Sequence, residues 1–269
     1  MARRRNPKKD KSARRRRPTR HPSAGNQARI SVETVSQLML AASPDALPLV
    51  GVAGVWLWNL AQDAPSAAYC VAGCLTLHYA LAEYGISSRI EAVILEVEGS
   101  DSHTLYGGDG PCWNSDGTFN GHTVLVVPEA GRFLDATLQQ YAEVPNTERA
   151  GLLMGRLPEG VAFGAAVLPL DRGDHLVVYH PVPEEQRNAW RGPGAVAHDA
   201  KFRQAGANLA ANVLDMLRLE HLRDKTLASP YPRLHRLVEA LEGAESVADG
   251  HGYRFRQRGG AEVRLADIP

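Results

Sequence analysis

One apolar stripe in the centre of the chain constrains the fold most strongly. Side chains that are apolar or carry a thiol recur at positions 70, 74, 77, 81 and 84, the spacing that places residues on one face of an α-helix. Pro65 and Ser66 precede the stripe, and Ser66 is a residue type that caps a first turn. Gly85 follows it, at the place where a left-handed residue commonly ends a helix. The spacing therefore predicts a helix with Cys70 in its first turn and Gly85 just beyond its end.

The segment after this helix is rich in strand-forming residues. We expect a strand over residues 90–98, a long Gly-, Asp- and Ser-rich loop over 99–121, and a hairpin whose strands cover 122–127 and 132–135. If the hairpin turns at Pro128–Gly131, Val127 pairs with Arg132. His122 and Asp135 then point to the same face, because side chains alternate along a strand. A slip of one residue would separate them.

The other elements expected from the sequence surround this centre. They are a helix over 30–41, a core segment over 48–61 with two tryptophans, strands near 161–169 and 175–180, helices over 200–223 and 232–241, and a short strand-forming end over 253–265. The pattern predicts an α+β fold with a basic tail (1–28), a main domain (29–185) and a mostly helical C-terminal extension (186–269).

Charge is distributed very unevenly along the 269 residues. The chain holds 30 basic and 30 acidic residues, but residues 1–20 carry eleven Lys or Arg and only one acid, Asp10. The first 28 residues have no apolar period to bury, so we expect them to be disordered and able to contact a polyanion such as nucleic acid. They contain no Phe, Tyr or Trp on which a base could stack.

The number of cysteines and the length of the most apolar run bear on the compartment and on membrane association. An odd number of cysteines, three, leaves at least one free thiol and favours a reducing compartment, so we expect a cytoplasmic protein. The most apolar run covers residues 46–60, shorter than the roughly 20 residues that span a bilayer. We therefore expect no membrane span, and no apolar segment of the kind that follows the basic start of a signal peptide.

Three central residues have the identity and order that thiol acyl transfer needs. An unperturbed thiol has a pKa of about 8.5, and it becomes a strong nucleophile when a helix N-terminus and an imidazolium stabilise the thiolate. Cys70 lies in the predicted first turn of a helix, and His122 opens a predicted strand. Asp135 ends the next strand, on the face from which it could orient the imidazole.

Two segments resemble a known family. YCVAGCLTLHYALAEYGISSRI resembles the nucleophile helix of the transglutaminase-like cysteine enzymes, which closes in a Gly-Ile-Pro-Ala-Arg-like turn; here Gly85–Arg89 matches with Ser in place of Pro. GHTVLVVPEAGRFLDAT resembles the family's His and Asp strands. The resemblance covers roughly residues 60–140. It implies a papain-related core, a helix packed on an antiparallel sheet, with Cys70 as nucleophile, His122 as base and Asp135 as orienting acid.

The implied activity is acyl transfer through a thioester intermediate, with release to water or to an amine. The substrate would be a peptide, a protein or a small amide or ester, and no cofactor is implied. The chain departs from the family at Thr123, where an aromatic residue is common after the His, and it has no recognisable substrate motif. The oxyanion hole would use the Cys70 N–H with a donor upstream, for which Trp58, Asn59 and Gln62 are candidates.

Several alternatives remain open at this stage. Cys112 in the long loop is a rival nucleophile, although it lacks a helix dipole, and Cys74 in mid-helix suits a core position. Zinc is a further hypothesis, since Cys70, Cys74 and His78 share one helix, with more potential ligands at His103, Cys112 and His122. No Cys-x-x-Cys or His-Glu-x-x-His spacing supports it. Finally, the domain could be an inactive interaction module whose basic tail binds an anionic partner, or a nucleic-acid-binding protein.

Overall fold

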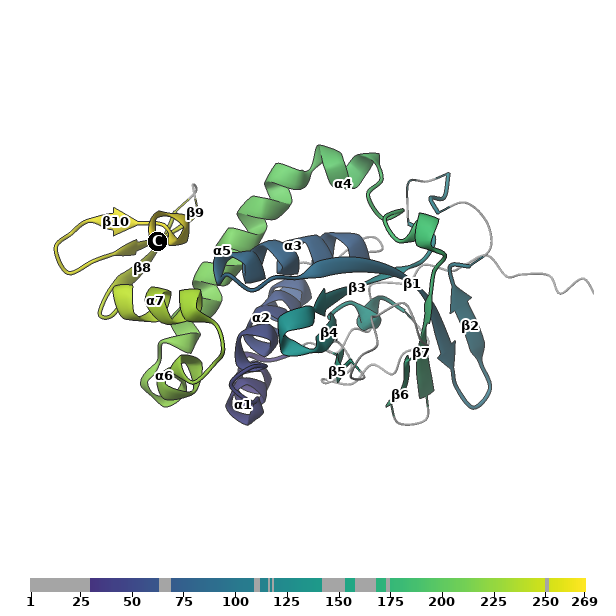
Figure 1. Ribbon diagram of the computed structural model, residues 1–269, viewed down its shortest axis with the longest axis horizontal. Coiled ribbons are helices and arrows are strands. Elements are labelled where there is room, and N and C mark those ends of the chain that lie inside the picture. Colours follow the sequence, from purple (N-terminus) through teal and green to yellow (C-terminus); the bar gives the residue numbers. More distant parts are fainter. Residues whose placement is uncertain are drawn as a thin grey trace, which may run out of the picture.

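The computed structural model describes residues 30–62, 69–108, 112–115, 117, 119–141, 153–157, 168–172, 175–249 and 252–269. These residues form an α+β fold in which helices pack against a curled antiparallel sheet (Figure 1). The predicted basic tail and the polyanion contact through residues 1–20 lie outside the described residues. The predictions for the tail therefore stay predictions.

Seven α-helices occur in the described residues: α1 (Val32–Ala41), α2 (Leu47–Gln62), α3 (Cys70–Glu83), α4 (Pro193–Ala197), α5 (Asp199–Leu217), α6 (Glu220–Leu227) and α7 (Pro232–Ala240). The helix predicted over 30–41 is α1, where the Ser31 hydroxyl accepts a hydrogen bond from the Thr34 N–H at 3.0 Å. The helix predicted from the central stripe is α3. Gly85 follows it with φ of +72°, which confirms the predicted left-handed ending.

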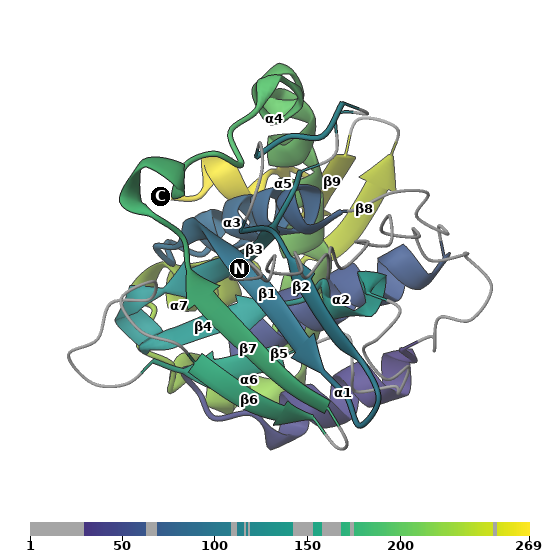
Figure 2. The ribbon, with the colours of Figure 1, turned by 90° about the vertical axis from the view of Figure 1, so that its right-hand side faces the viewer.

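The larger sheet has seven strands in the described residues: β1 (Arg89–Glu98), β2 (His103–Tyr106), β3 (His122–Val127), β4 (Arg132–Asp135), β5 (Leu153–Arg156), β6 (Leu168–Arg172) and β7 (His175–Pro181). Its order is β5-β4-β3-β1-β7-β6, and every pairing is antiparallel. The long strand β1 pairs with β3 through its first half and with β2 through its second half, while β7 lies along its other edge. Figure 2 shows β1 between β3 and β7.

The two faces of this sheet belong to different apolar clusters. One face, with Ile90, Leu125 and Leu134, joins the main core formed with the helices. The opposite face contributes to a smaller cluster that includes Val93, Phe133 and other residues of β1, β3, β4 and β7. Two members of the smaller cluster, Tyr141 and Tyr179, have their rings beside that of His122.

The C-terminal segment packs directly on the central helix. Helix α5 runs against α3, and the main core joins buried residues of both, such as Leu77 and Val213 (Figure 1). Beyond α7 the chain forms a small three-stranded antiparallel sheet of β8 (Glu245–Asp249), β9 (Gly252–Arg256) and β10 (Glu262–Val263). The predicted strand-forming end therefore exists, although it is part of a sheet that the sequence did not indicate.

Two sequence predictions need correction. The stretch 99–121 is not loop throughout, since β2 pairs with the end of β1 from Leu95↔Tyr106 to Glu98↔His103. The helix predicted over 200–223 is broken after Leu217, because Leu219 is extended (ψ 143°) and Thr226 Oγ1 donates to the freed Leu217 carbonyl at 2.9 Å. Of the strand predicted near 161–169, residues 161–167 lie outside the described part of the chain, and residues 168 and 169 belong to β6.

Helix α2 accounts for the most apolar run of the sequence. Its residues from Leu47 to Leu57 are largely buried in the main core, which agrees with the core role predicted for 48–61. None of the described helices has both the length and the apolar character needed to cross a bilayer.

Candidate active site

Cys70 occupies the N-terminal end of the central helix. It is the first residue of α3, and Tyr69 is the N-cap. The helix dipole there favours negative charge, so the backbone helps to stabilise a thiolate. The predicted cap, Ser66, lies outside the described residues, and the Tyr69 side chain makes no capping hydrogen bond. The Tyr69 N–H instead donates to Oε1 of Gln140 at 2.9 Å, which ties the start of α3 to the segment after β4.

The hairpin has the predicted register. Val127 pairs with Arg132, and the ladder continues through Leu125↔Leu134. The turn is a single 3₁₀ turn, Pro128–Ala130, closed by Gly131 in the left-handed region. His122 and Asp135 therefore point to the same face, and their side chains meet with 2.7 Å between Nε2 and Oδ2. Both are fully buried.

The Asp135 carboxylate is held by four hydrogen bonds. Oδ2 accepts from His122 Nε2 and from the Tyr179 hydroxyl at 2.7 Å, while Oδ1 accepts from the Thr137 N–H at 2.9 Å and the Thr137 hydroxyl at 3.0 Å. Burial works against the charge, but His122 and these donors overcome it and lower the pKa of Asp135. The residue therefore stays an anion and fixes the orientation of the imidazole.

The thiol and the imidazole shift each other's pKa in opposite directions. Burial disfavours charge on both groups. A hydrogen bond and the charge of His122 nevertheless lower the pKa of the Cys70 thiol. Interactions with Asp135 and then with Cys70 outweigh burial at His122 and raise its pKa to about 9. Both shifts favour a thiolate–imidazolium pair, the form in which a cysteine acts as a nucleophile.

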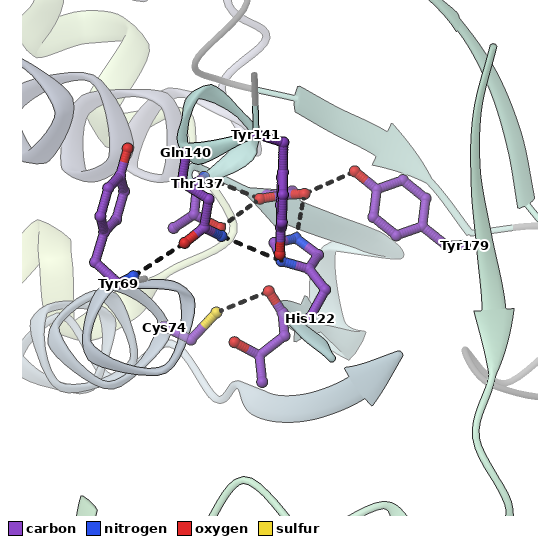
Figure 3. Close-up of polar contacts among 9 residues, drawn as sticks. Tyr69, Cys74, His122, Thr137, Gln140, Tyr141 and Tyr179 are labelled. Atoms are coloured by element: carbon purple, nitrogen blue, oxygen red, sulfur yellow. Dashed lines mark hydrogen bonds and ion pairs between the residues drawn. The ribbon is translucent and has the colours of Figure 1, made fainter. Parts of the chain in front are cut away.

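Two residues that the sequence did not single out lie at the other ring nitrogen of His122. The Tyr141 hydroxyl is 2.8 Å from Nδ1, and Nε2 of Gln140 is 3.5 Å from it. Figure 3 shows both beside the ring, with Gln140 also reaching back to Tyr69. Because Oε1 of Gln140 is held by the Tyr69 N–H, the amide nitrogen must face the imidazole. The only local signal for these residues was their place directly after the strand that carries Asp135.

Cys74 lies one turn along α3 and differs from Cys70 in chemistry. Its thiol donates to the Thr123 carbonyl at 3.4 Å (Figure 3). Burial raises its pKa well above 9.0. Cys74 is therefore a protonated core thiol, as expected from its mid-helix position. The Thr123 side chain acts against burial at both thiols, but at Cys74 burial prevails.

The rival nucleophile lies in the loop after β2, and the predicted upstream oxyanion donors belong to α2. Cys112 is half-buried in the loop after β2, where its carbonyl accepts from the Asn120 N–H at 2.8 Å. Within the described residues no imidazole contacts its thiol. Trp58 is half-buried on α2 and Asn59 is exposed there, while the side chain of Gln62 lies outside the described part.

The residues considered for zinc do not converge. Cys74 is bonded to Thr123, and His78 Nδ1 is 2.8 Å from the Ser88 hydroxyl. Among the described residues, the group that could hold a metal ion is Glu96, Glu98 and His103 on β1 and β2. Glu96 is already hydrogen-bonded there to His103 and His180. Within the described part of the chain, the site around Cys70 thus brings together one thiol, one imidazole and one carboxylate. No protein-family model, curated protein or solved structure matches this chain.

Proposed function

We propose that this protein is a cysteine-nucleophile acyl-transfer enzyme with a transglutaminase-like, papain-related core. The observation that carries the proposal is the buried pairing of Cys70, at a helix N-terminus, with His122, whose second nitrogen is held by Asp135. Structural cysteines in apolar surroundings have raised pKa values, as Cys74 does. A lowered pKa on an equally buried neighbour needs a specific arrangement of charge, and such arrangements are common at catalytic sites.

The residues support a two-step reaction. In the first step the Cys70 thiolate attacks the carbonyl carbon of an amide or ester, and the imidazolium of His122 gives its proton to the departing amine or alcohol. The products are a thioester on Cys70 and a neutral imidazole. In the second step His122 removes a proton from water or an amine that attacks the thioester. The bond to sulfur then breaks, and the thiolate–imidazolium pair is restored.

Two donors are suited to the oxyanion that forms in each step. The Cys70 backbone N–H belongs to the first turn of α3, whose N–H groups have no partner within the helix. Nε2 of Gln140 is the second donor that we assign, because the Tyr69 N–H fixes the opposite end of this amide. Gln140 is 5 % exposed, and a buried donor of this kind interacts strongly with developing charge.

Catalysis also requires that a substrate can reach the thiol. Cys70 is 2 % exposed, so an acyl substrate reaches the sulfur only if surrounding side chains move aside. Tyr141 is the described side chain best placed for this role, because its hydroxyl bonds His122 Nδ1 and its ring stands edge-on to the imidazole at 5.2 Å. Its movement would free the ring nitrogen that faces the thiol for proton transfer.

Trapping the acyl intermediate tests the proposal. Incubation with p-nitrophenyl acetate at neutral pH, followed by intact-mass analysis and peptide mapping, should show one acetyl group on Cys70 that hydroxylamine removes. Cys74→Ala should form the same adduct, whereas Cys70→Ala should not, and His122→Gln should form it much more slowly. Acetylation confined to lysines, or unchanged in Cys70→Ala, would contradict the enzyme and favour an inactive interaction module.

A further inference from the structure

A second concave site lies on the far half of α3, away from Cys70. The cavity has a volume of about 710 Å³ and is formed by α3, the start of β1, residues 187–191, α4 and the beginning of α5. This volume falls within the range of small-molecule sites, roughly 300–1,000 Å³. Its walls combine apolar side chains, among them Leu75 and Ile90, with four arginines. It is therefore a pocket that could bury an organic molecule and also hold a charge.

The charges in this pocket do not balance. Two carboxylates line it, and each is already paired with an arginine. Arg89 Nε lies 2.6 Å from Glu91, and Arg203 Nε lies 2.7 Å from Asp199. The other two arginines, Arg187 and Arg191, have no carboxylate partner in the described part of the chain. The pocket thus presents two uncompensated positive charges.

Two residues that line this pocket carry buried donors that lack acceptors. The indole Nε1 of Trp190 and the Nε of Arg187 are both buried and have no hydrogen-bond partner among the described residues. Trp190 is only 6 % exposed, and the Arg191 guanidinium lies over its ring at 5.1 Å. A buried N–H without an acceptor is unfavourable, so this arrangement suits an occupant that brings oxygen atoms. Because the free charges are positive, the matching occupant is an anion.

We propose that this pocket binds a small organic oxyanion, with its phosphate or carboxylate group on Arg187, Arg191 and the Trp190 indole N–H. Planar guanidinium groups suit both kinds of anion, since they can donate two parallel hydrogen bonds. The apolar walls hold the uncharged body of the ligand. An ion as small as inorganic phosphate would fill only part of the cavity.

This site goes beyond the proposed acyl-transfer function and does not depend on it. On α3 the pocket uses Leu75, His78 and Tyr79, whereas Cys70 and Cys74 face the Thr123 side of the same helix. Ligand binding is measured without any reaction at the thiol. The two proposals can therefore fail separately.

The test uses phenyl phosphate and benzoate as probes and benzyl alcohol as the neutral control, with the full chain labelled with ¹⁵N. The Trp190→Phe variant keeps an aromatic ring, removes the N–H and so identifies the Trp190 indole resonance. In the wild type, phenyl phosphate, benzoate or both should shift this resonance saturably. Arg187→Gln and Arg191→Ala should each weaken that binding about tenfold or more, as expected for the loss of a charged hydrogen bond.

Matched measurements separate binding from misfolding. Arg191 is exposed, so its replacement should leave the fold intact even if Arg187→Gln does not. Arg258→Ala removes an exposed arginine that does not line the pocket and should bind the probes as the wild type does. A stronger response to phenyl phosphate identifies the ligand group as a phosphate, and a stronger response to benzoate identifies a carboxylate. Equal binding of benzyl alcohol, no shift with either anion at millimolar concentration, or full affinity in Arg191→Ala would overturn the proposal.

Discussion

Replacing Cys70 by alanine should change how the stability of the protein depends on pH. The thiol has a lower pKa in the folded chain than its ordinary 9.0. Between these two pKa values the folded thiol is deprotonated and the unfolded thiol is protonated. Unfolding therefore takes up a proton, and this contribution to stability rises with pH until it is complete above 9.0. It is lost as pH falls through the folded pKa.

The contribution of His122 to stability changes with pH in the opposite direction. Its pKa is raised from 6.5 to about 9, so its stabilising contribution is complete below 6.5 and is lost as pH rises through about 9. In the wild type both contributions stabilise the fold, and their opposite slopes with pH offset each other wherever the folded thiol is deprotonated and the unfolded thiol is still protonated. In Cys70→Ala only the His122 contribution remains, somewhat reduced because the thiolate itself helps to raise that pKa. The stability of the variant should then fall relative to the wild type by up to about 1.4 kcal/mol per pH unit.

Cys74→Ala is the matched control. Cys74 is one turn away on α3 and is also 2 % exposed, but its pKa is well above 9.0, so it stays protonated in both states below that pH. Its replacement should lower stability by an amount that does not vary with pH. Urea unfolding followed by tryptophan fluorescence, at several pH values between about 6.5 and about 8.5, measures all three proteins across the window in which these groups differ. Parallel pH profiles for the two alanine variants would refute the thiolate–imidazolium pair.

Four further predictions concern the surroundings of the pair and the tail. Asp135→Asn should lower the pKa of His122, because the carboxylate raises it. Alkylation of Cys70 at neutral pH should then slow by about tenfold or more, since one pKa unit corresponds to about 1.4 kcal/mol. An unchanged rate of iodoacetamide labelling would count against the role of the carboxylate. Tyr179→Phe should cost about 1–3 kcal/mol in urea unfolding, because it removes a buried donor to Asp135; a neutral effect would mean that this bond is not made in solution. Gln140→Ala should slow acetyl transfer from p-nitrophenyl acetate by roughly 10²–10³-fold while Cys70 is still alkylated, and parallel losses in both assays would argue against an oxyanion donor. Deletion of residues 1–28 should leave the melting temperature unchanged, because the tail has no apolar period to bury, and a fall of several degrees in calorimetry would show that it packs on the body.

The elements that carry Cys70, His122 and Asp135 were predictable because their signals are local. The α3 stripe is set by helical spacing within 15 residues of Cys70, and Gly85 marks its end. The hairpin register follows from the short turn after Val127, which decides that His122 and Asp135 share a face. The lowered pKa of Cys70 depends in addition on tertiary packing, which brings the N-terminus of α3 close to His122 on β3.

The parts that the sequence did not reveal depend on contacts between distant segments. Tyr179 reaches Asp135 from β7, a strand that pairs with β1 and not with the hairpin. Gln140 joins the site because its amide meets the backbone of Tyr69, 71 positions earlier. Strand β2 has only four residues and lies in a Gly- and Asp-rich stretch, so the composition there predicts a loop. The strand forms because it pairs with the end of β1.

The most direct test of the central claim is competitive alkylation of the native protein with limiting iodoacetamide near pH 6, read by intact mass and peptide mapping. Exposure alone would favour Cys112, which is half-buried, over Cys70, which is 2 % exposed. The chemistry of the site predicts the reverse, because only the Cys70 thiolate is stabilised by both an imidazolium and a helix end. We expect the first label on Cys70, ahead of Cys112 and Cys74. Equal labelling of the three cysteines, or labelling of Cys112 first, would contradict the assignment of Cys70 as the nucleophile.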